Sequence, residues 1–332
     1  MFNTELSAIL DESGRLIDLS NKVKYKAELS AEDVEITKAI DAWAKDVGST
    51  GHDATHELSA MIRKAITQDS VLMPSDLIDR LFDTRTIGEF DDTRVEKAPK
   101  NTIKVFESVK GGNVDRSYFD FTTFAPKWTE LQAETEISLL EMRRGGYKTV
   151  TAAINFITEA LEQKKLKLVM DIIDLAISSG ADNYIPETGT TPSDAAIQKL
   201  ALYLQDVTDG DTPVIFGLNK YIQSISLLPG VTSFLTDAVK NQYNTTGKVT
   251  NYAGSQLIGL SGQKRLADGS LMIPDKRLFG AGGKIGEIIT RGETIVQQAT
   301  DINSDKIHIK VNGFSFGTMI TDISKAAKMV LA

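Results

Sequence analysis

The sequence predicts an α+β protein in which one long helix and several strand-rich segments occupy separate parts of the chain. The strongest helical signal runs from about residue 149 to residue 179, where large apolar residues recur at steps of three, four and seven. Residues 130–139 instead alternate between apolar and polar side chains, a pattern typical of a strand with one solvent-exposed face. Residues 181–300 mix short helical and strand-like runs with glycines. These three observations support the prediction of an α+β fold.

Composition excludes several kinds of function. The chain has 332 residues and no cysteine, so it cannot form disulfides, thiolate metal sites or cysteine nucleophiles. Its formal net charge of -8 opposes sequence-independent binding to nucleic-acid phosphates, which depends on Lys and Arg. The first residues lack the basic start and apolar core of a signal peptide, and no apolar run is long enough for a membrane span.

Residues 1–70 predict short amphipathic helices. Ser30 to Asp33 has the spacing of a capping box, in which the side chains at the cap and three residues later each bond the other's backbone. Ile36, Ile40 and Trp43 then form one apolar stripe. Such a stripe needs a partner, which either the body of the chain or a neighbouring molecule could supply.

Residues 98–126 predict a long β-hairpin. Two strand-like runs, 102–106 and 118–122, flank Lys110-Gly111-Gly112-Asn113, which is a strong turn signal. Because many of its side chains are charged, the hairpin has few positions for a core of its own. An isolated two-stranded hairpin is at best marginally stable, so we expect support from outside its own domain.

The long helix predicted from 149 to 179 would be roughly 45 Å long at about 1.5 Å per residue. Gly180 supplies its stop signal. Its predicted apolar stripe consists of Val150, Ile154, Ile157, Leu161, Leu168, Ile172 and Leu175.

The remainder predicts further short elements. A helix is expected from Ser193 to Leu204, and strands at 214–216, 256–260, 271–273 and 285–289. The alternation of Ile307, Ile309 and Val311 predicts a C-terminal strand, followed by a short helix from Asp322 to Val330.

This order of elements resembles the major capsid proteins of tailed phages with the Hong Kong-97 fold. The stretch from Phe316 to Ala326 (FGTMITDISKA) is similar to that family's ending, and Pro274 to Gly280 (PDKRLFG) is also similar to it. The resemblance implies a helical N-arm at 1–70, a P-domain at 71–180 and 301–332 with a spine helix at 149–179, an E-loop hairpin at 98–126, and an A-domain at 181–300.

The resemblance implies a structural, non-enzymatic protein without cofactors that self-assembles into an icosahedral shell around viral double-stranded DNA. Its expected partners are other copies of the chain, arranged in pentamers and hexamers. Portal, scaffold or decoration proteins are further candidate partners, and double-stranded DNA would be packaged without sequence specificity. No membrane partner is expected. It would be made in the cytoplasm of a bacterial host and end in the virion. The expected inter-subunit contacts are Lys104, Phe106, Lys110, Gly111, Gly112, Asn113, Arg116 and Tyr118 in the hairpin, and Ile36, Ile40 and Trp43 in the N-arm.

Two alternatives stay open on the sequence. An encapsulin-like nanocompartment has the same fold but packages a protein cargo. A nucleotide-binding α/β enzyme could use the glycine-rich stretch Gly280 to Gly286. However, Ile285 follows Lys284 where a Walker loop needs Ser or Thr, which favours a simple connection between strands.

Two other patterns are weaker still. His52 and His56 have metal-binding spacing, but Asp53 stands where the zincin pattern requires Glu, which favours an ordinary helix start. Three carboxylates share one face of the strand at 130–139, and a solvated face explains them better than acid–base chemistry. We therefore predict no catalytic, cofactor or metal site.

Overall fold

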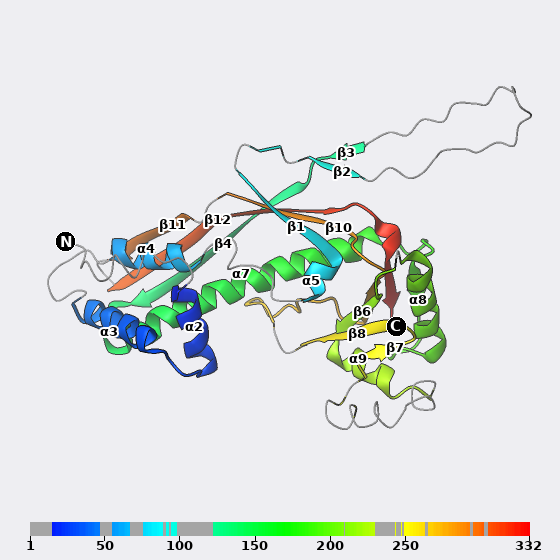
Figure 1. Ribbon diagram of the computed structural model, residues 1–332, viewed down its shortest axis with the longest axis horizontal. Coiled ribbons are helices and arrows are strands. Elements are labelled where there is room, and N and C mark those ends of the chain that lie inside the picture. Colours follow the sequence, from blue (N-terminus) through cyan, green and yellow to red (C-terminus); the bar gives the residue numbers. More distant parts are fainter. Residues whose placement is uncertain are drawn as a thin grey trace, which may run out of the picture.

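The computed structural model describes residues 15–46, 55–66, 76–88, 91–92, 94–97, 122–208, 210–229, 243, 247, 249–262, 265–292, 295–301 and 305–332. Within these ranges the chain forms two larger sheets, a small two-stranded sheet and a long helix that connects the two ends of the molecule (Figure 1).

The first sheet is built around β12 (Lys306–Ile320), a strand of 15 residues. One edge of β12 pairs with β10 (Gly286–Arg291) and β11 (Ile295–Asp301), and the other edge pairs with β4 (Lys127–Ser138), all antiparallel. β1 (Phe82–Ile87) adds to β10 in parallel and completes the five strands. The predicted alternation along β4 is confirmed, because Leu131 and Ile137 are buried while the glutamates between them are exposed.

The predicted long helix is confirmed as α7 (Tyr147–Ala176), which has 30 residues and runs along the five-stranded sheet (Figure 1). Its C-terminal stripe differs from the prediction. Val169 and Ile173 are buried there, whereas Leu175 is 83% exposed. At about 100° per residue, Leu175 stays within about 20° of Val150 around the helix, whereas the buried Val169 and Ile173 lie about 100° and 140° away from Val150. The buried face therefore changes along α7, because the helix packs against α2, α3 and β4 but ends beside β9 and β13.

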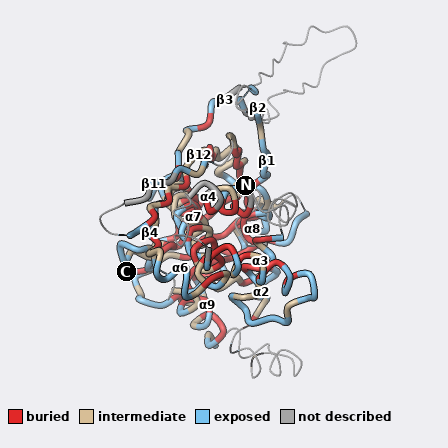
Figure 2. The backbone as a smooth tube through the Cα atoms, turned by 90° about the vertical axis from the view of Figure 1, so that its left-hand side faces the viewer, coloured by how far each residue is buried: buried red, intermediate tan, exposed pale blue. Residues whose placement is uncertain are grey.

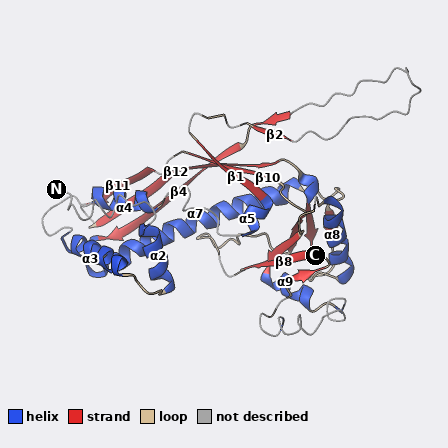
Figure 3. Cartoon of the chain, in the orientation of Figure 1, coloured by secondary structure: helices blue, strands red, loops and turns tan. Residues whose placement is uncertain are grey.

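The second sheet has six strands and lies at the other end of α7 (Figure 3). It combines β5 (Tyr184–Pro186), β13 (Ala326–Val330), β9 (Arg277–Ala281), β6 (Val214–Leu218), β8 (Ser255–Leu260) and β7 (Asn251–Tyr252) in that order. Helices α8 (Asp194–Val207) and α9 (Asn219–Ser226) pack on this sheet. All residues of β6 are buried, as expected for a strand covered on both faces.

The predicted C-terminal helix is wrong. Only a 3-10 turn, η1 (Ile323–Lys325), follows β12, and the next residues form β13, which pairs with β9 and β5. A short apolar run cannot by itself distinguish a buried strand from a buried helix. The ladder partners of β13, far along the chain, decide the outcome. The expected strand at 271–273 is likewise reduced to one bridge between Arg265 and Leu271.

Sheet membership also differs from the expected domain boundaries. β10 and most of β11, expected in the A-domain segment, belong to the five-stranded sheet, and β13 belongs to the six-stranded sheet. Among the described elements the chain therefore crosses between the sheets three times, through α7 between β4 and β5, at residues 282–285 and at 321–325.

The N-terminal helices are α2 (Arg15–Tyr25), α3 (Ala31–Asp46), α4 (Thr55–Ala65) and α5 (Asp76–Leu81), and α6 (Leu139–Gly145) precedes α7. α2 and α3 pack against α7, and α4 packs against β11 and β12. Figure 2 shows the buried residues of these elements gathered in the middle of the body. The N-terminal helices thus share the core of the five-stranded sheet.

Candidate assembly interface

The apolar stripe of α3 faces the chain's own core. Ile36, Ile40 and Trp43 are 3%, 1% and 8% exposed. This corrects the expectation that these three side chains contact a neighbouring subunit, because almost none of their surface is accessible. The stripe has its partner in α6 and α7 of the same chain.

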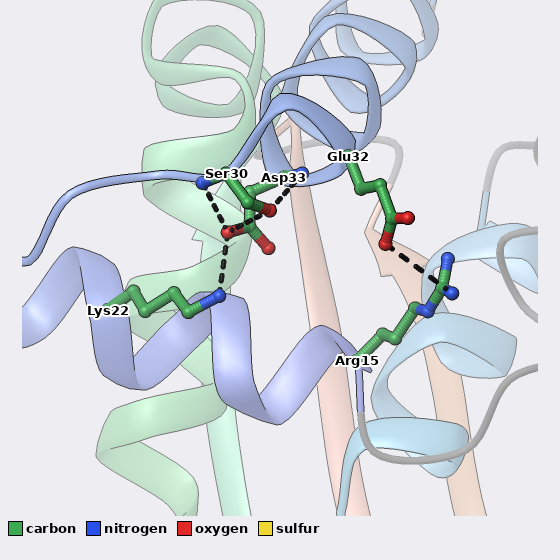
Figure 4. Close-up of polar contacts among 5 residues, drawn as sticks. All are labelled: Arg15, Lys22, Ser30, Glu32 and Asp33. Atoms are coloured by element: carbon green, nitrogen blue, oxygen red, sulfur yellow. Dashed lines mark hydrogen bonds and ion pairs between the residues drawn. The ribbon is translucent and has the colours of Figure 1, made fainter.

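A capping box at the start of α3 orients this helix (Figure 4). The backbone N–H of Asp33 donates to Ser30 Oγ at 3.2 Å, and the backbone N–H of Ser30 donates to Asp33 Oδ2 at 2.8 Å. Lys22 Nζ of α2 lies 2.7 Å from the same carboxylate oxygen. This ammonium is the main reason why the pKa of Asp33 lies below its ordinary value. The predicted box is confirmed, and it also joins α2 to α3.

The spine helix α7 begins on a side chain from α3. The backbone N–H of Tyr147 donates to Asp41 Oδ1 at 2.9 Å. Gly146 just before it has φ 51°, and a Cβ atom there would lie 1.9 Å from Asp41 Oδ1. Glycine is therefore required at 146 both for the left-handed backbone and for the approach of Asp41. Sequence reasoning missed this contact because 106 residues separate its partners.

The other end of α7 is held by a charged cluster. Asp174 pairs with Arg277 of β9 and with Lys328 of β13, whose Nζ lies 3.2 Å from Asp174 Oδ1 and donates to the Asp174 carbonyl at 2.7 Å. The side chains of Asp174 and Lys328 are only 14% and 8% exposed. This cluster connects the spine helix to the six-stranded sheet.

The expected hairpin contacts lie outside the described residues. These are Lys104, Phe106, Lys110, Gly111, Gly112, Asn113, Arg116 and Tyr118. The structure does describe the residues just before the predicted hairpin segment and those near its end, where β2 (Val95–Lys97) and β3 (Thr122–Phe124) pair antiparallel. They form a two-stranded sheet of their own, which stands away from the body next to β1 and β4 (Figure 1).

The glycine-rich stretch is a connection between the two sheets. A Cβ at Gly280 would lie 2.4 Å from Leu204 Cδ1, and one at Gly286 would lie 2.0 Å from the Met319 carbonyl oxygen. Lys284 forms an ion pair with Asp83. The stretch is followed by strand β10, whereas a nucleotide-binding loop leads into a helix. Close packing thus accounts for these glycines.

The side chains of the predicted histidine pair, His52 and His56, lie outside what the structure describes. His308 is in β12, where its Nδ1 lies 3.4 Å from Glu136 Oε1. No group of three or more His, Asp or Glu side chains suited to a metal occurs among the described residues.

The carboxylates of β4 are part of a charged strand face. Glu136 Oε2 lies 2.8 Å from Lys306 Nζ, and Glu134 stands opposite Lys310 in the register of β4 and β12. Cross-strand pairs of opposite charge stabilise a sheet. These glutamates therefore lie on the exposed face of β4, as expected for a solvated strand face.

Several large apolar side chains are exposed and were not singled out from the sequence. Phe156 of α7 is 70% exposed, and Leu202 of α8 and Leu227 after α9 are each more than 60% exposed. With Leu175 they add apolar surface at separate places on the body. None of the helices in the described ranges has the length and apolar character that a membrane crossing requires.

A family model described as "SPbeta prophage-derived putative capsid protein YonB" matches residues 16–322. No curated protein sequence matches the chain.

Solved capsid structures have a similar fold at low sequence identity. The "Capsid of native GTA particle computed with C5 symmetry" has 11% identity and a TM-score of 0.55, over 76% of this chain and 88% of that one. A chain of Mycobacterium phage Adephagia has 10% identity and a TM-score of 0.52, over 79% and 90%. The "Capsid structure of the Cyanophage P-SCSP1u" has 11% identity and a TM-score of 0.51, over 76% and 87%.

Proposed function

Because the chain belongs to the YonB family of SPbeta prophage-derived capsid proteins, we propose that it forms the icosahedral head of a phage, built from pentamers and hexamers of this subunit around double-stranded DNA. The protein has the Hong Kong-97 fold and is a structural capsid protein that assembles with copies of itself. The family and the packing role of the glycine-rich stretch favour this function over a nanocompartment shell or a nucleotide-binding enzyme.

The observation that supports assembly through the hairpin is the separate sheet of β2 and β3. Both strands leave the body next to the five-stranded sheet and pair only with each other among the described strands. A two-stranded sheet without a packed face gains little stability by itself. A neighbouring subunit that covers residues 98–121 would supply the missing contacts, and stable interfaces of this kind typically bury more than about 2,000 Å² in total.

The net negative charge of the chain is compatible with a shell that encloses DNA. A net charge of -8 disfavours tight counterion-releasing contacts with phosphates, so the DNA would be enclosed rather than tightly bound. Portal, scaffold and decoration proteins are further proposed partners. Synthesis would take place in the cytoplasm of the bacterial host, and the subunit would have no catalytic activity.

Deletion of residues 104–119 tests the hairpin's role. We expect the shortened chain to keep the circular dichroism spectrum and melting temperature of the full chain but to form no shells in negative-stain microscopy and light scattering. As a matched control, Phe106→Leu with Tyr118→Phe keeps a large apolar side chain at both positions and should still assemble. Normal particles from the shortened chain would contradict the proposal.

A further inference from the structure

An apolar groove of about 520 Å³ lies between β4, α6 and the first turns of α7. Ile137, Ala152, Ala153 and Phe156 contribute its apolar lining. Phe156 is 70% exposed although it lies in this lining. The volume is in the range of pockets that hold ligands, and the exposed ring of Phe156 gives an occupant apolar surface to cover.

The charged lining of the groove favours an acidic occupant. Arg144 and Lys148 line it and are exposed, and neither has an ion-pair partner among the described residues. Two acids also line the groove, but Glu136 is neutralised by Lys306 at 2.8 Å. Glu141 therefore remains as the single acid against two cations. A segment that combines apolar and acidic side chains would complement this surface.

The first 14 residues have this composition. They contain the acids Glu5, Asp11 and Glu12 and no Lys, Arg or His. Their large apolar residues after Met1 are Phe2, Leu6, Ile9 and Leu10, spaced as on one face of a helix. These residues lie outside the described ranges, which begin at Arg15.

The groove is within reach of this segment in the same chain. Ser20, five residues after Arg15, donates from Oγ to the Thr151 carbonyl at 3.0 Å, and its backbone carbonyl oxygen accepts from Asn155 Nδ2 at 2.9 Å. These turns of α7 also carry groove residues 152, 153 and 156. Fourteen residues can span roughly 46 Å, several times the helix diameter of about 10–12 Å. A short tether also gives an effective concentration of about 1 mM, which favours the chain's own segment over that of a second copy.

We propose that residues 1–14 occupy the groove of their own chain, with their apolar side chains against Phe156 and their carboxylates near Arg144 and Lys148. This contact does not depend on shell formation. It covers the exposed apolar surface of α7 while the subunit is free.

Disulfide trapping tests the contact, because the natural chain has no cysteine to interfere. Leu6→Cys is combined with Ala152→Cys in the full chain, and the dilute unassembled subunit is oxidised with copper phenanthroline. We expect an intramolecular disulfide, seen as a monomer band that changes mobility on reduction and confirmed by mass spectrometry. The matched control pairs Leu6→Cys with Leu202→Cys on α8, at the opposite end of the molecule from α2 (Figure 1), and should not form this bond.

Charge reversal tests the polar half of the contact. Arg144→Glu with Lys148→Glu should slow the trapping by about tenfold, since each exposed ion pair contributes modestly. Glu5→Lys with Glu12→Lys should restore the rate in that background. These residues are exposed or near the terminus, and circular dichroism verifies that the variants are folded. Disulfide-linked dimers, the absence of trapping, or a rate unaffected by charge reversal would each overturn the proposal, whether or not shells form.

Discussion

Lys165 is the side chain whose replacement should reveal most about the spine helix. It lies in the middle of α7, is only 5% exposed, and has its Nζ 5.7 Å from the centre of the Phe316 ring of β12. Burial lowers its pKa from 10.5 to about 8, and the charge of Glu162 only partly opposes this. One pKa unit corresponds to about 1.4 kcal/mol, so keeping the buried ammonium charged costs the folded state about 3 kcal/mol near pH 7.

Lys165→Met removes this cost and keeps an unbranched side chain in the same space. It also loses the cation–π contact with Phe316, which contributes about 1 kcal/mol. We therefore expect the variant to unfold with a free energy about 2 kcal/mol higher than that of the natural chain at pH 7. Guanidinium unfolding of the unassembled subunit, followed by circular dichroism, measures this difference.

The pH dependence provides the sharper test. Because the folded pKa lies below the unfolded one, the unfolded state binds more protons between about pH 8 and 10.5, so this lysine's destabilising effect diminishes as pH rises through that window. The advantage of the Met variant should shrink to below about 1 kcal/mol at pH 10, where the folded amine is neutral and no longer makes the cation–π contact. Lys164→Met, at the exposed neighbouring position, is the control and should change stability by less than about 0.5 kcal/mol. A Met variant less stable at pH 7, or an advantage that does not change with pH, would refute the reasoning.

Four further substitutions test the contacts that hold the N-terminal helices, the spine helix and the second sheet together. Asp41→Ala should lower the unfolding free energy by about 1 kcal/mol, because the start of α7 loses a hydrogen-bond acceptor. Gly146→Ala should lower it by about 2 kcal/mol or more, because residue 146 has a left-handed backbone. A denaturation midpoint equal to that of the natural chain would contradict either prediction. Asp33→Asn should cost about 1 kcal/mol at pH 7. Because the folded pKa of Asp33 is lowered, its contribution is present above about pH 4 and lost as pH falls through the folded pKa, so the natural chain and the variant should melt alike at the most acidic pH that keeps them folded. Asp174→Asn leaves the buried ammonium of Lys328 without its carboxylate and should cost about 3 kcal/mol, whereas an unchanged melting temperature would show that the cluster contributes no stability.

Local patterns predicted the elements that depend on local interactions. The capping box at Ser30 and Asp33 involves residues three apart, and the alternation along β4 follows from the geometry of a strand. The long helix was predictable from its apolar periodicity, but the change of its buried face that leaves Leu175 exposed depends on which elements pack against each end. These features need no knowledge of distant partners.

The candidate interface could be predicted only in part. The periodicity of Ile36, Ile40 and Trp43 indicated a buried face without indicating what would bury it, and the chain's own α6 and α7 do so. The exposed Phe156 gave no signal of its own, because an apolar residue in an apolar helix is expected to be buried.

The sequence by itself determined the fold class, the positions of the spine helix and of most strands, and the resemblance to phage capsid proteins. The tertiary structure decided that β13 is a strand, which sheet each C-terminal strand joins, and that Asp41 holds the start of α7. The physical reason is the range of the interactions. Periodicity and capping act within a few residues, whereas strand pairing and helix docking depend on partners often more than a hundred residues away, which a single sequence does not identify.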